Sequence, residues 1–284
     1  MTFCFFVADL HGKKERYKAL FNEIDSQQPD IVFLGGDLFP QGFCCDRQDK
    51  DDFLYDFLVP ELFSRKKRMK SDYPQVYVIL GNDDLRVNEK AMKEIEEEFG
   101  IWQYIHDKRI EYESFSFYGY SFIPPTPFGL KDWEKYDVSR FVDPGCTHPM
   151  QGTRTVEPDY DLEYSNIQID LNQLTGEEDL SSSVFLFHSP PYQTALDRAA
   201  LDGQMIDYVP LDVHVGSIAI KRFIEERQPL LTLHGHVHEA CSITGRWQEQ
   251  IKHTYAFTAA FDKNKLALVE FYLEDLANAQ RRII

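Results

Sequence analysis

Five short polar motifs each follow directly on a run of apolar residues, and no other feature of the chain constrains its fold as strongly. The apolar runs cover residues 3–8, 30–34, 75–80, 183–187 and 230–233. The motifs that follow them are Asp9-Leu10-His11, Gly36-Asp37, Gly81-Asn82-Asp83-Asp84, His188 and Gly235-His236-Val237-His238. Short apolar runs of this kind are typical of buried strands. Open α/β sheets bind ligands beyond the carboxyl ends of their strands, so the motifs predict one shared polar site.

Helical patterns separate several of these strands and predict an α/β fold. Apolar residues recur at helical spacing over residues 13–24, 53–62, 88–99 and 220–224. Alternation over 109–123 predicts antiparallel strands, and 253–273 predicts two closing strands followed by a short polar helix. Residues 124–181 read as an irregular insertion, and long irregular stretches are often functional. We expect one domain over residues 1–284.

Charge and composition narrow the class of protein. The net charge of −17 argues against nucleic acid as a partner, because affinity for a phosphate backbone comes chiefly from Lys and Arg. A small substrate is therefore favoured over a polymer. No apolar run approaches the roughly 20 residues of a membrane span. Residues 1–8 lack the basic start of a signal peptide, and the five cysteines show no paired spacing, so we expect a cytoplasmic chain.

The residue types in the five motifs indicate a metal site. In extended backbone, residues i and i+2 point to the same side, so Asp9 and His11 are expected to face one spot, as are His236 and His238. Carboxylate, imidazole and amide groups suit Mn, Fe, Zn, Ni or Mg rather than copper. Each motif alone is a weak signal, and the combination carries the prediction. His234 has the same spacing, and we interpret it as packing behind the ligands.

The order D-x-H, G-D, G-N-x-D, H, G-H-x-H resembles that of the calcineurin-like metallophosphoesterases and spans residues 9–238. This resemblance implies a four-layer αββα sandwich with a dinuclear metal centre. It implies that Asp9, His11, Asp37 and His238 hold one divalent ion. It implies that Asp37, Asn82, His188 and His236 hold the other. Stretches such as Pro124-Pro125-Thr126-Pro127-Phe128 and His214-Val215-Gly216-Ser217 resemble an uncharacterised prokaryotic branch of the family.

The activity implied by the resemblance is hydrolysis of a small phosphoester, leaning to phosphodiesters. Two such ions, typically about 3.5–4 Å apart, would polarise the phosphoryl group and acidify a water molecule, so in-line attack by metal-bound hydroxide is expected. A nuclease is an alternative that the acidic composition disfavours. A non-catalytic metal-binding scaffold is another, although every metal position of the motif set is filled. The oligomeric state is not determined by the sequence.

The chain departs from the family at Asp83. Many relatives read G-N-H-[D/E], where the histidine faces the leaving oxygen, and an ionised aspartate cannot donate a proton. Three interpretations remain open: a phosphodiester or a good leaving group, replacement of the acid by another group such as His214, or an Asp83 that turns away from a weak enzyme. Asp84 either keeps the acidic last position of the motif or caps the following helix.

Two further features have alternative explanations. Gly216-Ser217 near a helix start can bind an anion, but an ordinary helix cap is favoured. Four aromatic side chains can either select the organic part of a substrate or pack the irregular segment against the sheets, and packing is favoured. These are Tyr118, Tyr120, Phe128 and Trp133.

Overall fold

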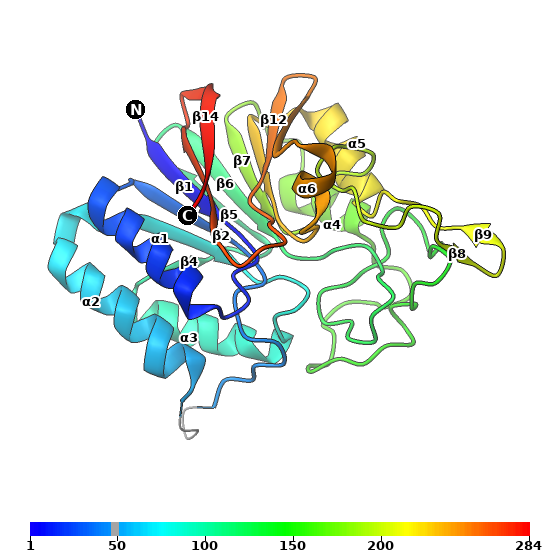
Figure 1. Ribbon diagram of the computed structural model, residues 1–284, viewed down its shortest axis with the longest axis horizontal. Helices are drawn as coiled ribbons and strands as arrows, with labels where there is room; N and C mark the ends of the chain where they lie inside the picture. The colour runs from blue at the N-terminus through cyan, green and yellow to red at the C-terminus, as the bar shows by residue number, and fades with distance from the viewer. Residues whose placement is uncertain (47–50) are drawn as a thin grey trace.

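The computed structural model describes residues 1–46 and 51–284, and two six-stranded sheets form its centre (Figure 1). The first sheet has the order β14-β13-β1-β2-β3-β4. Its strands β1 to β4 are parallel, and β13 joins β1 antiparallel. The strands are β1 (Phe3–Val7), β2 (Ile31–Gly35), β3 (Gln75–Ile79), β4 (Gln103–Tyr104), β13 (Ala267–Tyr272) and β14 (Asp275–Ile283).

The second sheet has the order β11-β12-β10-β7-β6-β5. Strands β6, β7, β10 and β12 are parallel, and the two edge strands β5 and β11 run antiparallel to their neighbours. The strands are β5 (Lys108–Tyr112), β6 (Phe115–Tyr120), β7 (Ser183–Phe187), β10 (Leu231–His234), β11 (Gln248–Ile251) and β12 (Thr254–Thr258).

The two sheets pack face to face through aromatic side chains. The rings of Phe33 on β2 and Phe117 on β6 lie 5.3 Å apart, and those of Phe257 on β12 and Phe271 on β13 lie 5.8 Å apart. Alternate residues of a strand point to opposite faces, so Phe6 packs between the sheets while Phe5 packs toward the helices. Burial on both faces explains why the central strands read as continuous apolar runs.

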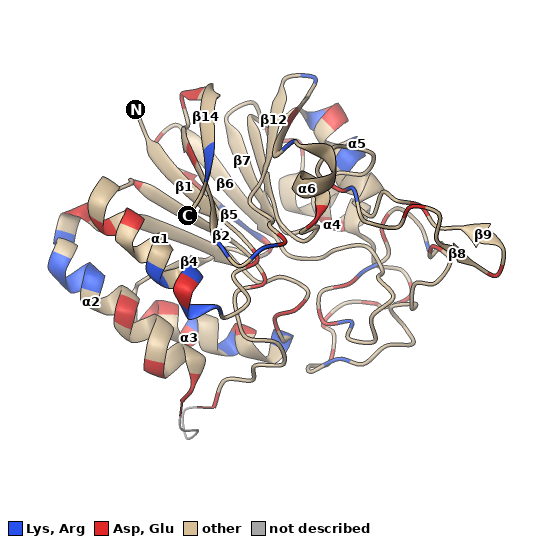
Figure 2. Ribbon diagram, viewed as in Figure 1, with Lys and Arg blue, Asp and Glu red and all other residues tan. Residues whose placement is uncertain are grey.

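Helices cover the outer faces and complete the four-layer αββα sandwich that the resemblance implied. In Figure 1, α1, α2 and α3 lie over the first sheet, and α4 and α5 lie beside the second. The helices are α1 (Lys14–Gln27), α2 (Val59–Met69), α3 (Glu89–Phe99), α4 (Ile167–Thr175), α5 (Ile218–Arg227) and the short α6 (Ala240–Thr244). A π-helical turn, Phe53–Leu58, leads into α2. The basic residues in the last turn of α2 lie on this outer layer (Figure 2).

The prediction of a short polar helix after the second closing strand is wrong. Residues 275–283 form β14, which pairs antiparallel with β13 after a tight turn. Leu276 is buried, and Arg282 donates to the carboxylate of Glu270 on β13. A solvated edge strand needs few apolar residues, because only one of its faces is covered.

The segment after β6 is irregular over most of its length, as expected, but it contains α4, which the sequence reading missed. Within this segment, and between β7 and α5, short bridges and turns replace regular sheet, apart from the hairpin of β8 (Met205–Ile206) and β9 (Val209–Pro210). This hairpin projects at one end of the molecule in Figure 1. Within residues 1–46 and 51–284, none of the helices has the length and apolar character needed to cross a membrane.

Candidate metal centre

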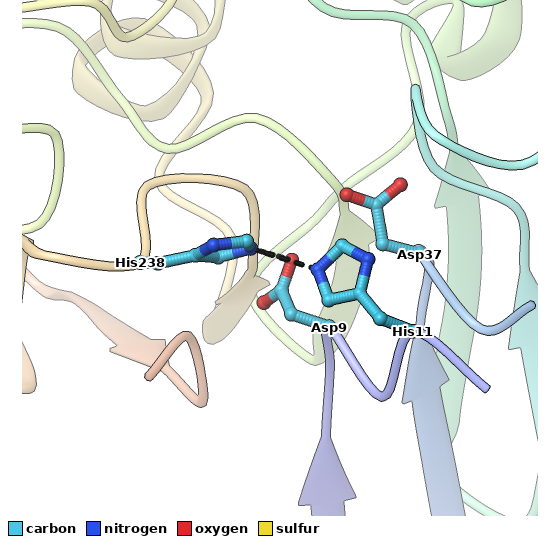
Figure 3. Close-up of side chains that lie close together, drawn as sticks. All are labelled: Asp9, His11, Asp37 and His238. Atoms are coloured by element: carbon cyan, nitrogen blue, oxygen red, sulfur yellow. Dashed lines mark hydrogen bonds and ion pairs between the residues drawn. The ribbon is translucent and has the colours of Figure 1, made fainter. Parts of the chain in front are cut away.

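Four of the predicted metal ligands converge at the carboxyl ends of the central strands. One ligand atom from each of Asp9, His11, Asp37 and His238 lies within 4.8 Å of those of the other three. The first two follow β1, Asp37 follows β2, and His238 follows β10 (Figure 3). The Nε2 atoms of His11 and His238 are 3.0 Å apart, and the Nε2 atom of His238 is 3.4 Å from an oxygen of Asp9. This is the set that the resemblance implied for one ion.

The backbone brings these side chains together by a different route from the one that the spacing predicted. Asp9, His11, Asp37 and His236 have φ angles of 57°, 47°, 53° and 73°, in the left-handed region rather than in extended backbone. The amide of Asp9 donates to the carbonyl of Gly36, and that of His11 donates to the carbonyl of Asp37. The two loops that follow β1 and β2 are therefore linked to each other, and tight turns replace the expected period of two.

The second predicted set is grouped around His188. Its Nδ1 atom donates to the carbonyl oxygen of Gly35 at 2.8 Å, which orients the ring. Its Nε2 atom then lies 3.0 Å from Oδ1 of Asn82 and 3.2 Å from Oδ2 of Asp37. The ring of His236 lies beside it, with centroids 5.4 Å apart. Asp37 contacts both groups of residues and is buried between them.

Two glycines in the motifs give the ligands room. A Cβ atom on Gly81 would lie 2.3 Å from Oδ1 of Asp37 and 2.6 Å from a carbon of the His188 ring. A Cβ atom on Gly36, which has a φ of 92°, would lie 2.7 Å from Nδ1 of His188. Any side chain at either position would displace a ligand or its backbone. The glycines are therefore required by the close approach of three strand ends.

The electrostatics of the cluster suit a divalent cation. Burial disfavours charge on Asp9, but its hydrogen bond with His238 holds the pKa of Asp9 below its usual value. Burial also opposes charge on His188, yet the Asp37 carboxylate raises the pKa of His188 to about 10, whereas burial lowers the pKa of His236 to about 3. Oδ2 of Asp9 is buried without a hydrogen-bond partner, and a cation would satisfy it. The residues present therefore fit borderline-to-hard metal ions.

Asp83 and Asp84 occupy different environments. Asp83 accepts a hydrogen bond from Nδ2 of Asn82, and its other oxygen lies 3.6 Å from Nδ1 of His11. Asp84 is fully buried, and its carboxylate accepts from the backbone amides of Leu38, Phe39 and Gly81. Asp84 therefore does not cap the following helix, one of its two expected roles. It braces the loop that carries Asp37 against the loop that carries Asn82.

His214 is paired with a buried carboxylate that the sequence reading missed. Its Nδ1 atom lies 2.8 Å from Oδ1 of Asp197, a residue with no exposed surface. Asp197 also accepts from the amides of Gln193, Thr194 and Gly216, so its position is fixed. The partner of His214 is 17 residues away in an irregular loop, and no local pattern indicated it.

A cavity of about 510 Å³ opens beside the metal-ligand cluster. Asp37, Asn82, His236 and His238 border it, and so do Asp83 and His214. Of the four aromatic residues considered in the sequence, three pack in the interior as expected. Tyr118, Tyr120 and Trp133 are buried, whereas Phe128 lines the cavity and is 63% exposed.

His234 and the start of α5 both have structural roles. Both ring nitrogens of His234 contact oxygens outside the cluster, those of the Ser189 carbonyl and the Thr232 hydroxyl, so His234 packs behind the ligands. Ser217 caps α5 through its hydroxyl, and the carboxylate of Asp137 accepts from the amides of Ile218 and Ala219. The Asp137 carboxylate therefore occupies the amides at the start of α5. This agrees with the prediction of an ordinary helix cap at Gly216-Ser217.

Comparisons with known proteins agree with this architecture. The family model of the calcineurin-like phosphoesterases matches residues 5–240. The crystal structure of TT1561 of Thermus thermophilus has a TM-score of 0.57 at 13% identity, covering 99% of this chain and 98% of that one. Another crystal structure has a TM-score of 0.57 at 14% identity, with the same two coverages. At this identity the similarity establishes the fold alone. The comparison with curated proteins gives no match.

Proposed function

The chain belongs to the calcineurin-like phosphoesterase family, and on that premise we propose that it hydrolyses a small phosphoester, preferably a phosphodiester, with two divalent metal ions. The observation that carries the proposal is the convergence of Asp9, His11, Asp37 and His238 within 4.8 Å at the strand ends. In the proposal these four residues hold one ion. Asp37, Asn82, His188 and His236 hold the second, with Asp37 shared between the two.

The metal ions, when bound, would neutralise charge on the phosphoryl oxygens and acidify a water molecule. The protein's own contribution is to hold the ligands in place before the substrate arrives. The Gly35 carbonyl fixes the tautomer of His188 by accepting from Nδ1. The backbone amide of His236 donates to Oδ1 of Asp9 at 3.0 Å and orients that carboxylate. The amide of Asp83 does the same for Oδ1 of Asp37 at 2.8 Å.

The preference for a phosphodiester rests on Asp83. It borders the cavity beside the proposed ligand Asn82, where its carboxylate would repel a phosphate group that enters. A diester carries one negative charge at neutral pH and a monoester close to two, so the repulsion is smaller for a diester.

We assign the proton donor of the leaving oxygen to His214. It borders the same cavity, and its bond to the buried Asp197 leaves Nε2 as the ring atom available to a ligand. A buried carboxylate on one ring nitrogen orients an imidazole. This arrangement would replace the histidine that many relatives carry at the position of Asp83.

The direct test is a metal analysis of the untreated protein together with an assay against mono-, di- and cyclic phosphates. We expect about two equivalents of divalent metal and turnover of an aryl phosphodiester with Mn²⁺, lost on chelation and restored by added metal. Bound metal without turnover of any phosphate would favour a scaffold. A DNA mobility shift that weakens with salt would favour a nuclease.

The Asp83→His variant tests the proposed preference for phosphodiesters. A histidine at this position removes a negative charge and supplies a donor, so monoester turnover should rise relative to diester turnover. The measurement is the ratio of kcat/KM for p-nitrophenyl phosphate and bis(p-nitrophenyl) phosphate. An unchanged ratio would count against the role given to Asp83.

The compartment of this activity is also part of the proposal. Cys4, Cys44, Cys146 and Cys241 are free thiols, which supports a reducing environment, and we place the protein in the cytoplasm.

A further inference from the structure

The cavity beside the metal cluster changes character away from the ligands. Its near end is bordered by Asp37, Asn82, His236 and His238. Much of the remaining wall comes from apolar side chains of two separate chain segments. The volume of about 510 Å³ lies within the range of about 300–1,000 Å³ that is usual for small-molecule sites.

The apolar wall is built by two segments that approach each other closely. Residues 124–146 supply Phe128 and Phe141, and residues 199–215 supply Ile206. The segments meet at Gly145, where a Cβ atom would lie 2.2 Å from Cδ1 of Ile206. Phe128 and Phe141 are 63% and 71% exposed, so the rim presents uncovered aromatic rings. Exposed apolar surface that continues into a pocket is typical of a binding site.

The charge of the wall excludes a second anionic group on the ligand. Among the described residues that line the cavity, none is Lys or Arg. Several lining residues are acidic, including Asp143 and Asp212. An anion placed against this wall would find no cationic partner and would be repelled by carboxylates. A nucleoside polyphosphate or a nucleic acid strand therefore does not match it.

We propose that the substrate carries an uncharged apolar substituent, an alkyl or aryl group, which fills this cavity while its single phosphoester group lies at the metal end. The inference rests on the proposed function for the placement of the phosphoester. It extends the proposed function by naming the class of substrate. In this proposal the metal ions bind the phosphoester group, and the apolar wall selects the organic group. Apolar burial supplies the binding energy on the wall side, in proportion to the area removed from water.

Binding of alkylphosphonates tests this directly, because these compounds cannot be hydrolysed as esters. Methyl-, butyl- and hexylphosphonate would be titrated into the metal-loaded protein by isothermal calorimetry. Each buried methylene strengthens binding by up to about fourfold, so we expect hexylphosphonate to bind at least about tenfold more tightly than methylphosphonate. The chain of 5-phosphonopentanoate ends in a carboxylate, and it should bind more weakly than butylphosphonate.

Variants of the wall localise the effect. Phe141 and Val142 both line the cavity. Phe141→Ser and Val142→Ser should each reduce the gain from methyl- to hexylphosphonate while leaving methylphosphonate binding unchanged. Ile243→Ser is the matched control, because Ile243 is 43% exposed on α6 and does not line the cavity. An affinity that does not depend on chain length would overturn the inference. So would tight binding of the carboxylate compound, or an equal gain in the wall variants and the wild type.

The outcomes separate this inference from the proposed function. A gain with chain length in a protein that hydrolyses no phosphoester would overturn the function and leave the apolar site standing. Phosphoester hydrolysis without any dependence of binding on chain length would overturn the apolar site alone. Failure of every phosphonate to bind the metal-loaded protein, together with no hydrolysis of any phosphoester, would contradict both.

Discussion

The metal-ligand cluster and the segment 124–146 border the same cavity, but their residues are held in place differently. Each proposed ligand lies within a few residues of a buried strand, and the sheets fix its position. The wall segment has no helix or regular strand and depends on buried charged groups. Glu134 accepts from the amide and the hydroxyl of Thr126, and Lys131 donates to Glu134 and to the Thr126 carbonyl.

This difference separates two kinds of change. A substitution at a strand end disturbs ligands that three strands position together, so it should affect chemistry. A substitution in segment 124–146 alters a surface that the sheets do not depend on, so it should affect stability or selectivity. Loops on a rigid scaffold commonly carry specificity in this way. The four predictions that follow test the separation, from the largest expected effect to the smallest.

Asp37→Ala should have the largest effect, because Asp37 contacts both proposed groups of ligands. We expect loss of most bound metal and a fall in kcat/KM on the order of 10³-fold or more. Substitution of a residue that only supports a metal ligand typically costs about 10–100-fold in activity. Metal analysis and the diester assay measure both. Glu226→Ala, an exposed acidic residue on α5, is the control. An active variant with its full metal content would refute the assignment of the ligands.

His214→Gln should leave the metal content unchanged and lower turnover of substrates with poor leaving groups by about 10²–10⁴-fold, the usual value of general acid help. The loss should be smaller for p-nitrophenyl leaving groups, which need little protonation. Asp197→Asn should produce part of the same loss, again larger for poor leaving groups than for p-nitrophenyl groups, because Asp197 positions His214. Equal losses for good and poor leaving groups would contradict the role of a proton donor.

Glu134→Ala should destabilise the wall without changing the metal centre. Lys131 and Glu134 are both buried, and removal of one member of such a pair costs about 3–5 kcal/mol, because the other charge stays unpaired. Urea unfolding would measure the change. Glu163→Ala breaks an exposed pair with Arg140 nearby and should cost about 0–1 kcal/mol. Loss of bound metal in folded Glu134→Ala would show that the two regions are coupled.

The smallest expected effect is on the pH dependence of stability and comes from His106, which lies at the junction of the second sheet and the wall. Burial lowers the pKa of His106 well below its usual 6.5, and its ring packs on Trp133. The unfolded chain binds this proton below about pH 6.5 and the folded chain does not. The contribution of His106 to stability is therefore complete above that pH and is lost as the pH falls, by up to about 1.4 kcal/mol per pH unit.

The His106→Asn variant tests this contribution, since its side-chain oxygen can accept from the amide of Ser121 as Nδ1 does. The free energy of unfolding, measured at pH 7.5 and 5.5, should fall less in the variant than in the wild type. Identical falls would show that His106 takes up its proton in the folded protein.

The sequence by itself determined the central strands to within one residue and the side chains that meet at their ends. This was possible because a buried parallel strand and the polar residue after it are neighbours in the chain, and strand ends share one edge. The sequence did not predict the backbone conformation of the loops that carry these side chains. Asp9 and His11 meet through left-handed turns, whose hydrogen-bond partners lie on the loop after β2.

The tertiary structure decided the features whose partners are remote in sequence. The polar stretch of β14 becomes a strand because β13 offers it an edge, and its composition alone favours neither strand nor helix. His214 acquires its direction from Asp197, and the apolar wall exists only where residues 124–146 meet Ile206. Such contacts depend on side chains brought together by folding, so spacing and composition carry no record of them.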